Sequence, residues 1–326
     1  MVLRKCGIGT LALVALLGCT APSIAQEYPS RPITLMVPYA AGGPTDIVAR
    51  SLGQTMGKAL QQTVLIENTV GAGGTIAPTK LKNSAPDGYT LLLAHIGMST
   101  APALYRTLPF RPVEDFEHIG QVVDVPMTLI ARQTLEARDL RELIAYIRAN
   151  RDKLSFANAG IGSASHLCGL LFMSAIDVDI TTVPYKGTAP ALTDLVSGQI
   201  QLLADPMLSS LPLARAGKIK ALGLTSLKRA TAAPEIPTVE ESGVKGFEFV
   251  SWYGLWGPRN LPAEVNAFLQ EASAKVLALP EVKQRLGELG FGPIGSTSEH
   301  FARYIETEMA KYAAIIRDAK IGAIEQ

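Results

Sequence analysis

Short apolar runs alternate along this chain with longer segments in which apolar residues recur every three or four positions. A short run of this kind predicts a buried strand, and the longer spacing predicts a helix with one buried face. The runs that predict strands lie at 33–37, 63–67, 90–94, 127–131, 154–157, 181–184, 200–204 and 219–225. Strands that are apolar on both faces and separated by helices are typical of parallel sheets with helices on both sides.

The alternation divides the chain into two α/β units of about 100 residues each, a common size for a folding unit. A third segment, Pro262 to Ile321, is nearly all helical. If this tail packs on the first unit, the chain crosses between the units near Val125 and again near Val250, which forms a paired hinge. We therefore expect an α/β protein with two lobes, each with a parallel-type sheet flanked by helices, and a cleft between them. The predicted lobes span 26–125 with 251–326, and 126–250.

The first 25 residues have the pattern of a secretory signal peptide. Two basic residues precede an apolar run, Leu11 to Leu17, which is too short for the roughly 20 residues of a membrane-spanning helix. Small residues before Gln26 fit a cleavage site, so residues 1–25 are expected to be removed and the mature protein to be periplasmic. The alternative is a lipoprotein signal with a lipid on Cys19, which the bulky leucine two positions earlier disfavours.

Composition excludes several classes of function. The chain carries 30 basic and 29 acidic residues, which is not the basic surface that nucleic-acid binding requires. Of the three cysteines, Cys168 alone lies beyond the signal peptide, and it is expected to be a buried apolar residue rather than a nucleophile. The histidines do not have the spacing of metal ligands, so we predict no metal and no cofactor. These histidines are His95, His118, His166 and His300.

A glycine pair stands where the first predicted strand meets the first predicted helix, in the stretch V-P-Y-A-A-G-G-P-T-D-I-V-A-R. Gly42 and Gly43 allow the backbone to approach a ligand closely. Pro44 suits the first position of a helix, and Asp46 falls near the third, where an acidic side chain complements the helix dipole. Unpaired N–H groups at such a helix start can bind an anion. A tight turn without a ligand would use the same residues.

Similar loops occur twice more, as G-A-G-G-T at 71–75 and N-A-G-I-G-S-A-S-H at 158–166. Both lack the third glycine of a dinucleotide-binding fingerprint, because Ile76 and Ser165 stand in its place. A nucleotide-binding, dehydrogenase-like enzyme is therefore the alternative and not the first interpretation. A hydrolase is disfavoured as well, because His166 lies too near its serines in sequence to be presumed their base. Main-chain anion binding from both lobes explains the recurrence better.

Several motifs, in order along the chain, resemble those of the Bug receptors, the periplasmic solute-binding components of tripartite tricarboxylate transporters. The motifs are Y-P-S-R-P-I-T-L-M-V-P at 28, A-G-G-P-T-D-I-V-A-R at 41, G-A-G-G at 71, D-G-Y-T-L-L-L at 87, G-S-A-S-H-L at 162, Y-K-G-T-A-P-A-L-T-D-L-V-S-G-Q at 185, A-G-K-I-K-A-L-G-L-T-S at 216 and I-P-T-V-E-E-S-G at 236. The resemblance covers essentially the whole chain after the signal peptide. It implies a two-lobed periplasmic-binding-protein (Venus flytrap) fold without enzymatic activity.

The resemblance also implies a binding site. One carboxylate of the ligand is held by the loop after the first strand and by the Gly-Ser loop of the second lobe, partly through waters. The residues of this sequence that match are Ala41, Gly42, Gly43, Pro44, Thr45, Asp46, Gly160, Gly162, Ser163 and Ser165. The sequence departs from the family pattern at Thr69 and Val70, where a basic residue and a proline are usual, and at Leu170, where a glutamate is usual.

Ligand identity should depend on the distal half of the cleft. The residues expected to line it are Tyr39, His95, Met98, Ser99, Tyr185, Lys186, Thr188, Asp205 and Tyr253. Among them, Lys186 is expected to point into water. His95 is either a contact for the far end of the ligand or a hydrogen-bonded histidine at a strand edge. Asp205 follows a predicted strand, so it either accepts a hydrogen bond from a ligand hydroxyl or ammonium group or caps the next helix.

Together these features predict a periplasmic receptor that captures a small mono- or dicarboxylate, aliphatic or aromatic, and closes on it. The expected partner is a membrane permease or a signalling protein. We expect a monomer that binds neither a cofactor nor a nucleic acid.

Overall fold

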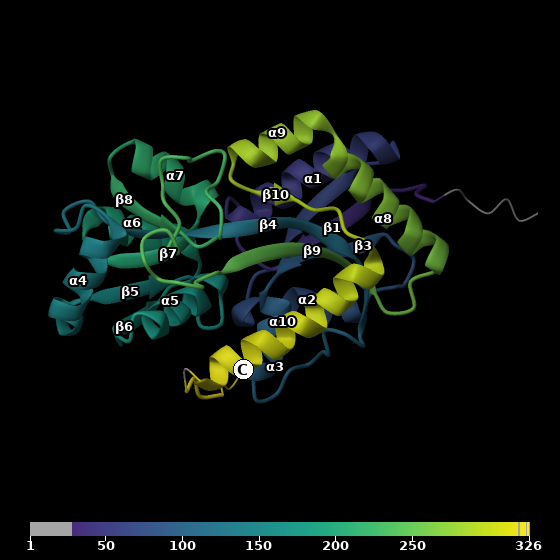
Figure 1. The fold of residues 1–326 in the computed structure, drawn as a ribbon. Helices are drawn as coiled ribbons and strands as arrows, with labels where there is room; N and C mark the ends of the chain where they lie inside the picture. The colour runs from purple at the N-terminus through teal and green to yellow at the C-terminus, as the bar shows by residue number, and fades with distance from the viewer. Residues whose placement is uncertain (1–27, 319, 324, 326) are drawn as a thin grey trace, which may run out of the picture.

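The computed structural model describes residues 28–318, 320–323 and 325. The predicted signal peptide, the alternative lipid site at Cys19 and the cleavage site before Gln26 lie outside the described residues. The model is a mixed α/β structure with two lobes, one in teal and green and the other in purple and yellow-green (Figure 1). This is the fold class that the sequence predicts.

Six of the eight predicted strands pair in parallel, β1 with β2 and β3, and β5 with β6 and β7. The expectation of parallel pairing was wrong for the runs at 127–131 and 219–225, which pair with each other antiparallel. The six parallel strands are β1 (Ile33–Val37), β2 (Val64–Asn68), β3 (Thr90–His95), β5 (Ser155–Asn158), β6 (Thr181–Pro184) and β7 (Leu202–Pro206). The intervening helices are α1 (Pro44–Leu60), η1 (Ala72–Gly74), α2 (Ile76–Lys82), α3 (Gly97–Leu104), α4 (Leu140–Asn150), η2 (Arg151–Lys153), α5 (Ala164–Ala175), α6 (Thr188–Ser197) and α7 (Met207–Arg215). Parallel pairing brings the loops that follow the strands to one edge of each sheet.

Two long antiparallel strands join the parallel units. Strand β4 (Phe116–Arg132) is far longer than the predicted run at 127–131, and β9 (Val250–Pro258) was not predicted at all. Within the described residues the strands form one ten-stranded sheet with the order β2-β1-β3-β9-β4-β7-β5-β6. Strands β8 (Ile219–Leu224) and β10 (Gly292–Pro293) also pair with β4. The sheets of the two lobes are therefore continuous through β4.

The two points at which the chain is predicted to pass between the lobes are neighbours in the structure. The first lies inside β4, where Pro126 is in register with Val250 of β9. Beside them, the buried hydroxyl of Thr225 accepts a hydrogen bond from the Met127 N–H at 2.8 Å and lies 2.6 Å from the Phe249 carbonyl oxygen. One side chain thus ties both crossings together. The lobe boundaries at 125 and 250 stay a prediction.

The C-terminal helices lie on opposite faces of the sheet in the first lobe (Figure 1). Helices α8 (Ala263–Ala278) and α9 (Pro280–Glu288) pack on the face that carries the apolar residues of α1. Helix α10 (Ser298–Asp318) packs on the other face, where Phe301 and Tyr312 join Trp252 and Trp256 of β9. The buried carboxylate of Glu308 accepts a hydrogen bond from the indole N–H of Trp252 at 2.9 Å.

Gly254 of β9 faces the buried ring of Phe301 at very close range. A Cβ added at Gly254 would lie 2.0 Å from Cζ of that ring. Extra atoms in a packed core typically cost about 1–3 kcal/mol. We expect Gly254→Ala to lower the free energy of unfolding by about that amount, measured by urea denaturation. Gly287→Ala, whose added Cβ has no heavy atom within 4 Å, is the control, and an equal denaturation midpoint in both variants would contradict this packing.

Candidate functional site

The loop from β1 to α1 has the geometry that its glycines suggested. Gly42 has a φ of 80°, which favours glycine, and Gly43 is the N-cap of α1 in an extended conformation. Pro44 occupies the first helical position. The N–H groups of Thr45 and Asp46, in the first turn, have no carbonyl one turn back to bond. These two N–H groups are therefore the donors at this helix start that can face an anion.

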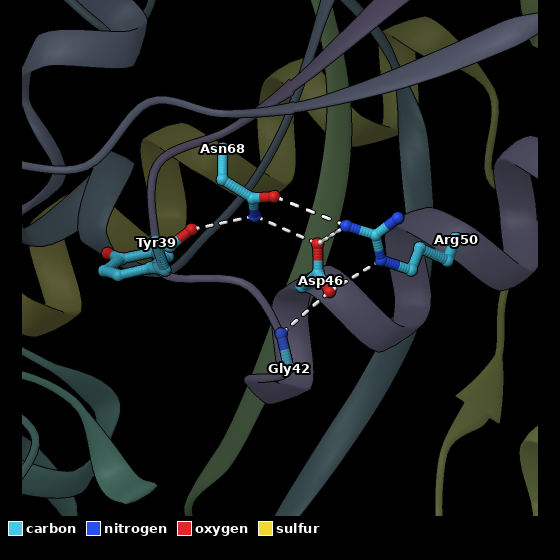
Figure 2. A network of polar contacts seen from close by, with 5 residues as sticks. All are labelled: Tyr39, Gly42, Asp46, Arg50 and Asn68. Carbon is cyan, nitrogen blue, oxygen red and sulfur yellow. Dashed lines mark hydrogen bonds and ion pairs between the residues drawn. The ribbon is translucent and has the colours of Figure 1, made fainter. Parts of the chain in front are cut away.

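The side chain of Asp46 holds this loop in shape (Figure 2). One carboxylate oxygen accepts hydrogen bonds from the Gly42 N–H at 2.9 Å and from Arg50 Nε at 2.8 Å. The other accepts from Asn68 Nδ2 at 2.9 Å, and Asn68 also donates to the carbonyl of Tyr39. Burial by itself would raise the pKa of Asp46, but these hydrogen bonds outweigh it and hold the pKa below its usual range.

This network refines the prediction for the first loop. The carboxylate of Asp46 and the N–H of Gly42 are both bonded to protein groups, so they position the loop. Since the carboxylate of Asp46 is bonded to the protein, the predicted contact of Asp46 with the ligand is now expected to be made by its backbone N–H. The spacing of four residues between Asp46 and Arg50 is visible in the sequence. Asn68 lies on the neighbouring strand, and only the pairing of β1 with β2 brings it into the network.

The loop from β5 to α5 repeats this arrangement in the second lobe. Gly160 and Gly162 have φ values of 120° and 79°. Ser163 caps α5 by accepting a hydrogen bond from the His166 N–H at 3.2 Å. The Gly162 N–H donates to Nδ1 of His166 at 3.1 Å, as the Gly42 N–H donates to Asp46. Ser165 donates to the carbonyl of Ala204 at 2.6 Å, which ties this loop to β7.

The histidine of this loop is a neutral structural acceptor. Burial lowers the pKa of His166 to about 4, and because Nδ1 accepts the Gly162 N–H, the ring proton lies on Nε2. This role was missed from sequence, where His166 was weighed only as a base for serine and as a metal ligand. The signal in the sequence that could have indicated this role is the spacing of four residues between Gly162 and His166.

An aromatic cluster surrounds the loop after β3. The ring of Tyr39 stacks on His95 with centroids 4.5 Å apart, and Tyr253 meets His95 edge-on at 5.9 Å. His95 Nδ1 accepts the Gly97 N–H at 2.9 Å, and burial lowers the pKa of His95 to about 4. His95 is thus a buried, neutral, hydrogen-bonded ring. Its predicted contact with the ligand stays a prediction, as does that of the buried Ser99.

Asp205 brings the second lobe to the same cluster. It lies in β7, one residue before the end of the strand, and is fully buried, and Ser209 Oγ donates to its Oδ2 at 2.5 Å. Burial raises the pKa of Asp205 to about 7. The pKa of Tyr253 is raised to about 12 by burial and by the nearby Asp205, against a hydrogen bond with Thr45. Tyr253 of β9 is thus hydrogen-bonded to Thr45 at the start of α1, and the charge of Asp205 on β7 acts on Tyr253 from nearby.

The other residues predicted in the second lobe lie farther along its edge. Tyr185 is half-buried, and its hydroxyl donates to Asp194 of α6 at 2.7 Å. Its backbone N–H donates to the Asn158 carbonyl at 2.9 Å, which joins this loop to the one that opens α5. Thr188 begins α6, and Lys186 is exposed, in accord with its expected position in water. The ligand contacts of Tyr185 and Thr188 stay predictions.

The two lobes touch beside these loops. Thr100 Oγ1 of α3 donates to the Gly162 carbonyl at 3.2 Å. Leu104 of α3 lies so close that a Cβ on Gly162 would be 2.1 Å from its Cδ1. Sequence analysis did not identify Thr100 or Leu104, because neither belongs to a binding motif. Their contacts show that the part of α3 from Thr100 to Leu104 packs against the loop that precedes α5.

Other kinds of site are not found in the described part of the chain. It contains no group of three or more His, Cys, Asp or Glu side chains that could hold a metal ion. Cys168 is a free, buried thiol, and burial raises its pKa. No helix among the described residues has the length and apolar character to cross a membrane.

The sequence matches the family model described as the tripartite tricarboxylate transporter family receptor over residues 48–321. The chain belongs to this family. A relative from Agrobacterium vitis, described as a UPF0065 protein in the TAR-I ttuE-ttuC' intergenic region, is 40% identical over 312 residues, which cover 94% of this chain and 90% of that protein. The Bug resemblance seen in the sequence motifs is therefore confirmed.

Solved structures of receptors in this family share the fold. The periplasmic binding protein BugD is 44% identical with a TM-score of 0.85, and the match covers 92% of this chain and all (100%) of that one. The Rpa4515 protein of R. palustris with adipate is 33% identical, with a TM-score of 0.88 and coverage of 91% and 100%. MatC of Rhodopseudomonas palustris with bound malate is 37% identical, with a TM-score of 0.82 and coverage of 89% and 100%. Members of this family are solute-binding proteins and not enzymes.

Proposed function

We propose that this receptor captures a small carboxylate between its lobes by means of backbone N–H groups at the starts of α1 and α5. The observation that carries the proposal is the matched pair of glycine loops, each held by a side chain that accepts the glycine N–H. The first-turn N–H groups of Thr45 and Asp46 in α1, and of Ala164 and Ser165 in α5, have no carbonyl one turn back and point out of the helix end. The carboxylate ligands of two family structures, adipate and malate, support the proposal.

Main-chain donors are sufficient for such a ligand. A hydrogen bond to a charged group contributes roughly 1.5 to 3 kcal/mol, and a partly buried helix start adds up to about 2 kcal/mol. Three or four donors therefore approach the roughly 8 kcal/mol of micromolar binding, and burial of the rest of the ligand supplies the remainder. The arginine nearest in the chain to the first loop, Arg50, is already paired with Asp46.

In this proposal the receptor acts in the periplasm as a monomer and closes by a change at the paired crossings in β4 and before β9. Thr225, which joins both crossings, lies where the bending would occur. The loaded receptor then delivers its ligand to a membrane permease of the tripartite tricarboxylate type, as the family description suggests. The carboxylate is aliphatic or aromatic.

A thermal-shift screen of the protein without residues 1–25 tests the proposal. Ligand at a hundred times its dissociation constant stabilises the folded state by about 2.7 kcal/mol, so we expect a clear rise in Tm with at least one small carboxylic acid. The matched neutral amides should give no rise, since they lack the charge. NAD should give none either, and should not quench the buried indoles of Trp252 and Trp256. Equal shifts with acids and amides would contradict anion binding at the helix starts.

A further inference from the structure

Two buried polar atoms on opposite residues of β4 and β7 have no hydrogen-bond partner in the described part of the chain. Within the described residues, Asp205 Oδ1 and Thr128 Oγ1 make no hydrogen bond, and both side chains have 0% exposure. Asp205 of β7 and Thr128 of β4 are directly opposite in the antiparallel register, so they share one face of the sheet. Buried polar atoms are nearly always satisfied, and a pair that is not satisfied calls for a reason.

Asp205 does not cap the backbone of α7, the helix that follows it. The N-cap of α7 is Pro206, and no side chain caps that helix. The one hydrogen bond that Asp205 makes is to Ser209, and it engages Oδ2 and leaves Oδ1 unused. The structure therefore removes the capping role that the sequence allowed. A buried carboxyl oxygen without a hydrogen bond is costly, and a partner on a bound ligand would remove that cost.

The position of Asp205 places that partner next to the bound carboxylate. Its neighbour Ala204 accepts the hydrogen bond from Ser165, in the first turn of α5. On the other side, Asp205 lies near Tyr253, which is hydrogen-bonded to Thr45 in the first turn of α1. The bond from Ser165 to Ala204 therefore places Asp205 next to the start of α5, one of the two helix starts at which the proposed function places the anion.

We propose that Asp205 accepts a hydrogen bond from a hydroxyl or ammonium group that the ligand carries close to its bound carboxylate. The ligands are then hydroxy acids or amino acids, and unsubstituted acids of the same length bind more weakly. This inference rests on the proposed function. Thr128 faces the same group and is its second polar neighbour.

Isothermal titration with acids that differ only in this donor tests the inference. The aliphatic series is succinate, L-malate and L-aspartate, and the aromatic series is phenylacetate, mandelate and phenylglycine. In the series that binds, the best donor-bearing acid should bind at least roughly tenfold more tightly than the unsubstituted one, as expected for one hydrogen bond to a charged group. A preference for the hydroxy acid or for the amino acid identifies the donor.

Asp205→Asn should reduce this preference by roughly tenfold to a hundredfold while changing the affinity for the unsubstituted acid little. Asp115→Asn is the matched control, because Asp115 is also a buried carboxylate but pairs with Lys82 and Arg111 away from the site. Melting curves of both variants verify that they are folded. If neither series binds to the wild type, the proposed function fails; if acids bind but Asp205→Asn keeps the full preference, the inference about Asp205 alone is wrong.

Discussion

Replacing Gly43 with valine is expected to weaken carboxylate binding by at least about a hundredfold while leaving the fold intact. Gly43 has an extended conformation, φ −77° and ψ 169°, which valine adopts readily. The one heavy atom within 4 Å of an added Cβ is the Ala40 carbonyl oxygen, at 3.4 Å. The valine methyl groups would therefore stand in the space before the first turn of α1, where the anion must approach its N–H donors.

Titration of the variant with the acid that gives the largest thermal shift measures this effect. Gly43→Ala provides a graded control, because it adds the Cβ without the branch. Gly162 would be a poor choice for the same test, since its added Cβ would collide with Leu104 and disturb the fold. An unchanged thermal shift in Gly43→Val would remove this loop from the site.

Asp205→Asn is expected to stabilise the ligand-free protein, and more strongly at high pH. The pKa of Asp205 is raised from 3.8 to about 7 by burial. Between these pH values the folded protein binds a proton that the unfolded chain does not, so stability falls as the pH rises through this window. The raised pKa of Asp205 therefore lowers the free energy of unfolding by about 2 kcal/mol at pH 5 and by on the order of 4 kcal/mol at pH 8. Asparagine has no such effect.

The difference between the two pH values is the informative quantity, because any change in packing caused by asparagine is the same at both. We expect the gain in free energy of unfolding to be roughly 2 to 3 kcal/mol larger at pH 8 than at pH 5, measured by urea denaturation. A gain that does not vary with pH would show that Asp205 is not an isolated buried acid. A receptor that keeps such a destabilising side chain trades stability for a function of that residue.

The parallel units were predictable because their strands are continuous apolar runs and their helices have regular spacing. The strand at Ile33–Val37 and the helix that begins at Pro44 show this best, since proline and glycine mark the helix start. The central strands were harder to recognise. Strand β4 contains Gly120 and Pro126 and two register shifts in its pairing with β9, so its first half lacks a strand pattern. Strand β9 contains glycines that are required because residues distant in sequence, such as Phe301, pack against them.

The candidate site likewise has a part that could be predicted from sequence and a part that could not. The glycine loops could be identified from sequence because a helix start has local signals. The groups that shape and tune the site could not, because their roles depend on contacts between elements. Asn68 meets Asp46 through the pairing of β1 with β2. Asp205 lies near Tyr253 because β7 and β9 flank β4. Neither the burial of Asp205 nor its missing hydrogen-bond partner is visible in sequence.

Strand β4 runs unbroken from Phe116 to Arg132 and pairs with strands of both lobes. Neither half of the molecule therefore contains a complete sheet. A chimera of one half of this receptor and the other half of a relative would have to combine β4 segments from two different proteins. Ligand preference in this architecture is better transplanted by exchanging the short connections at the sheet edge than by shuffling halves.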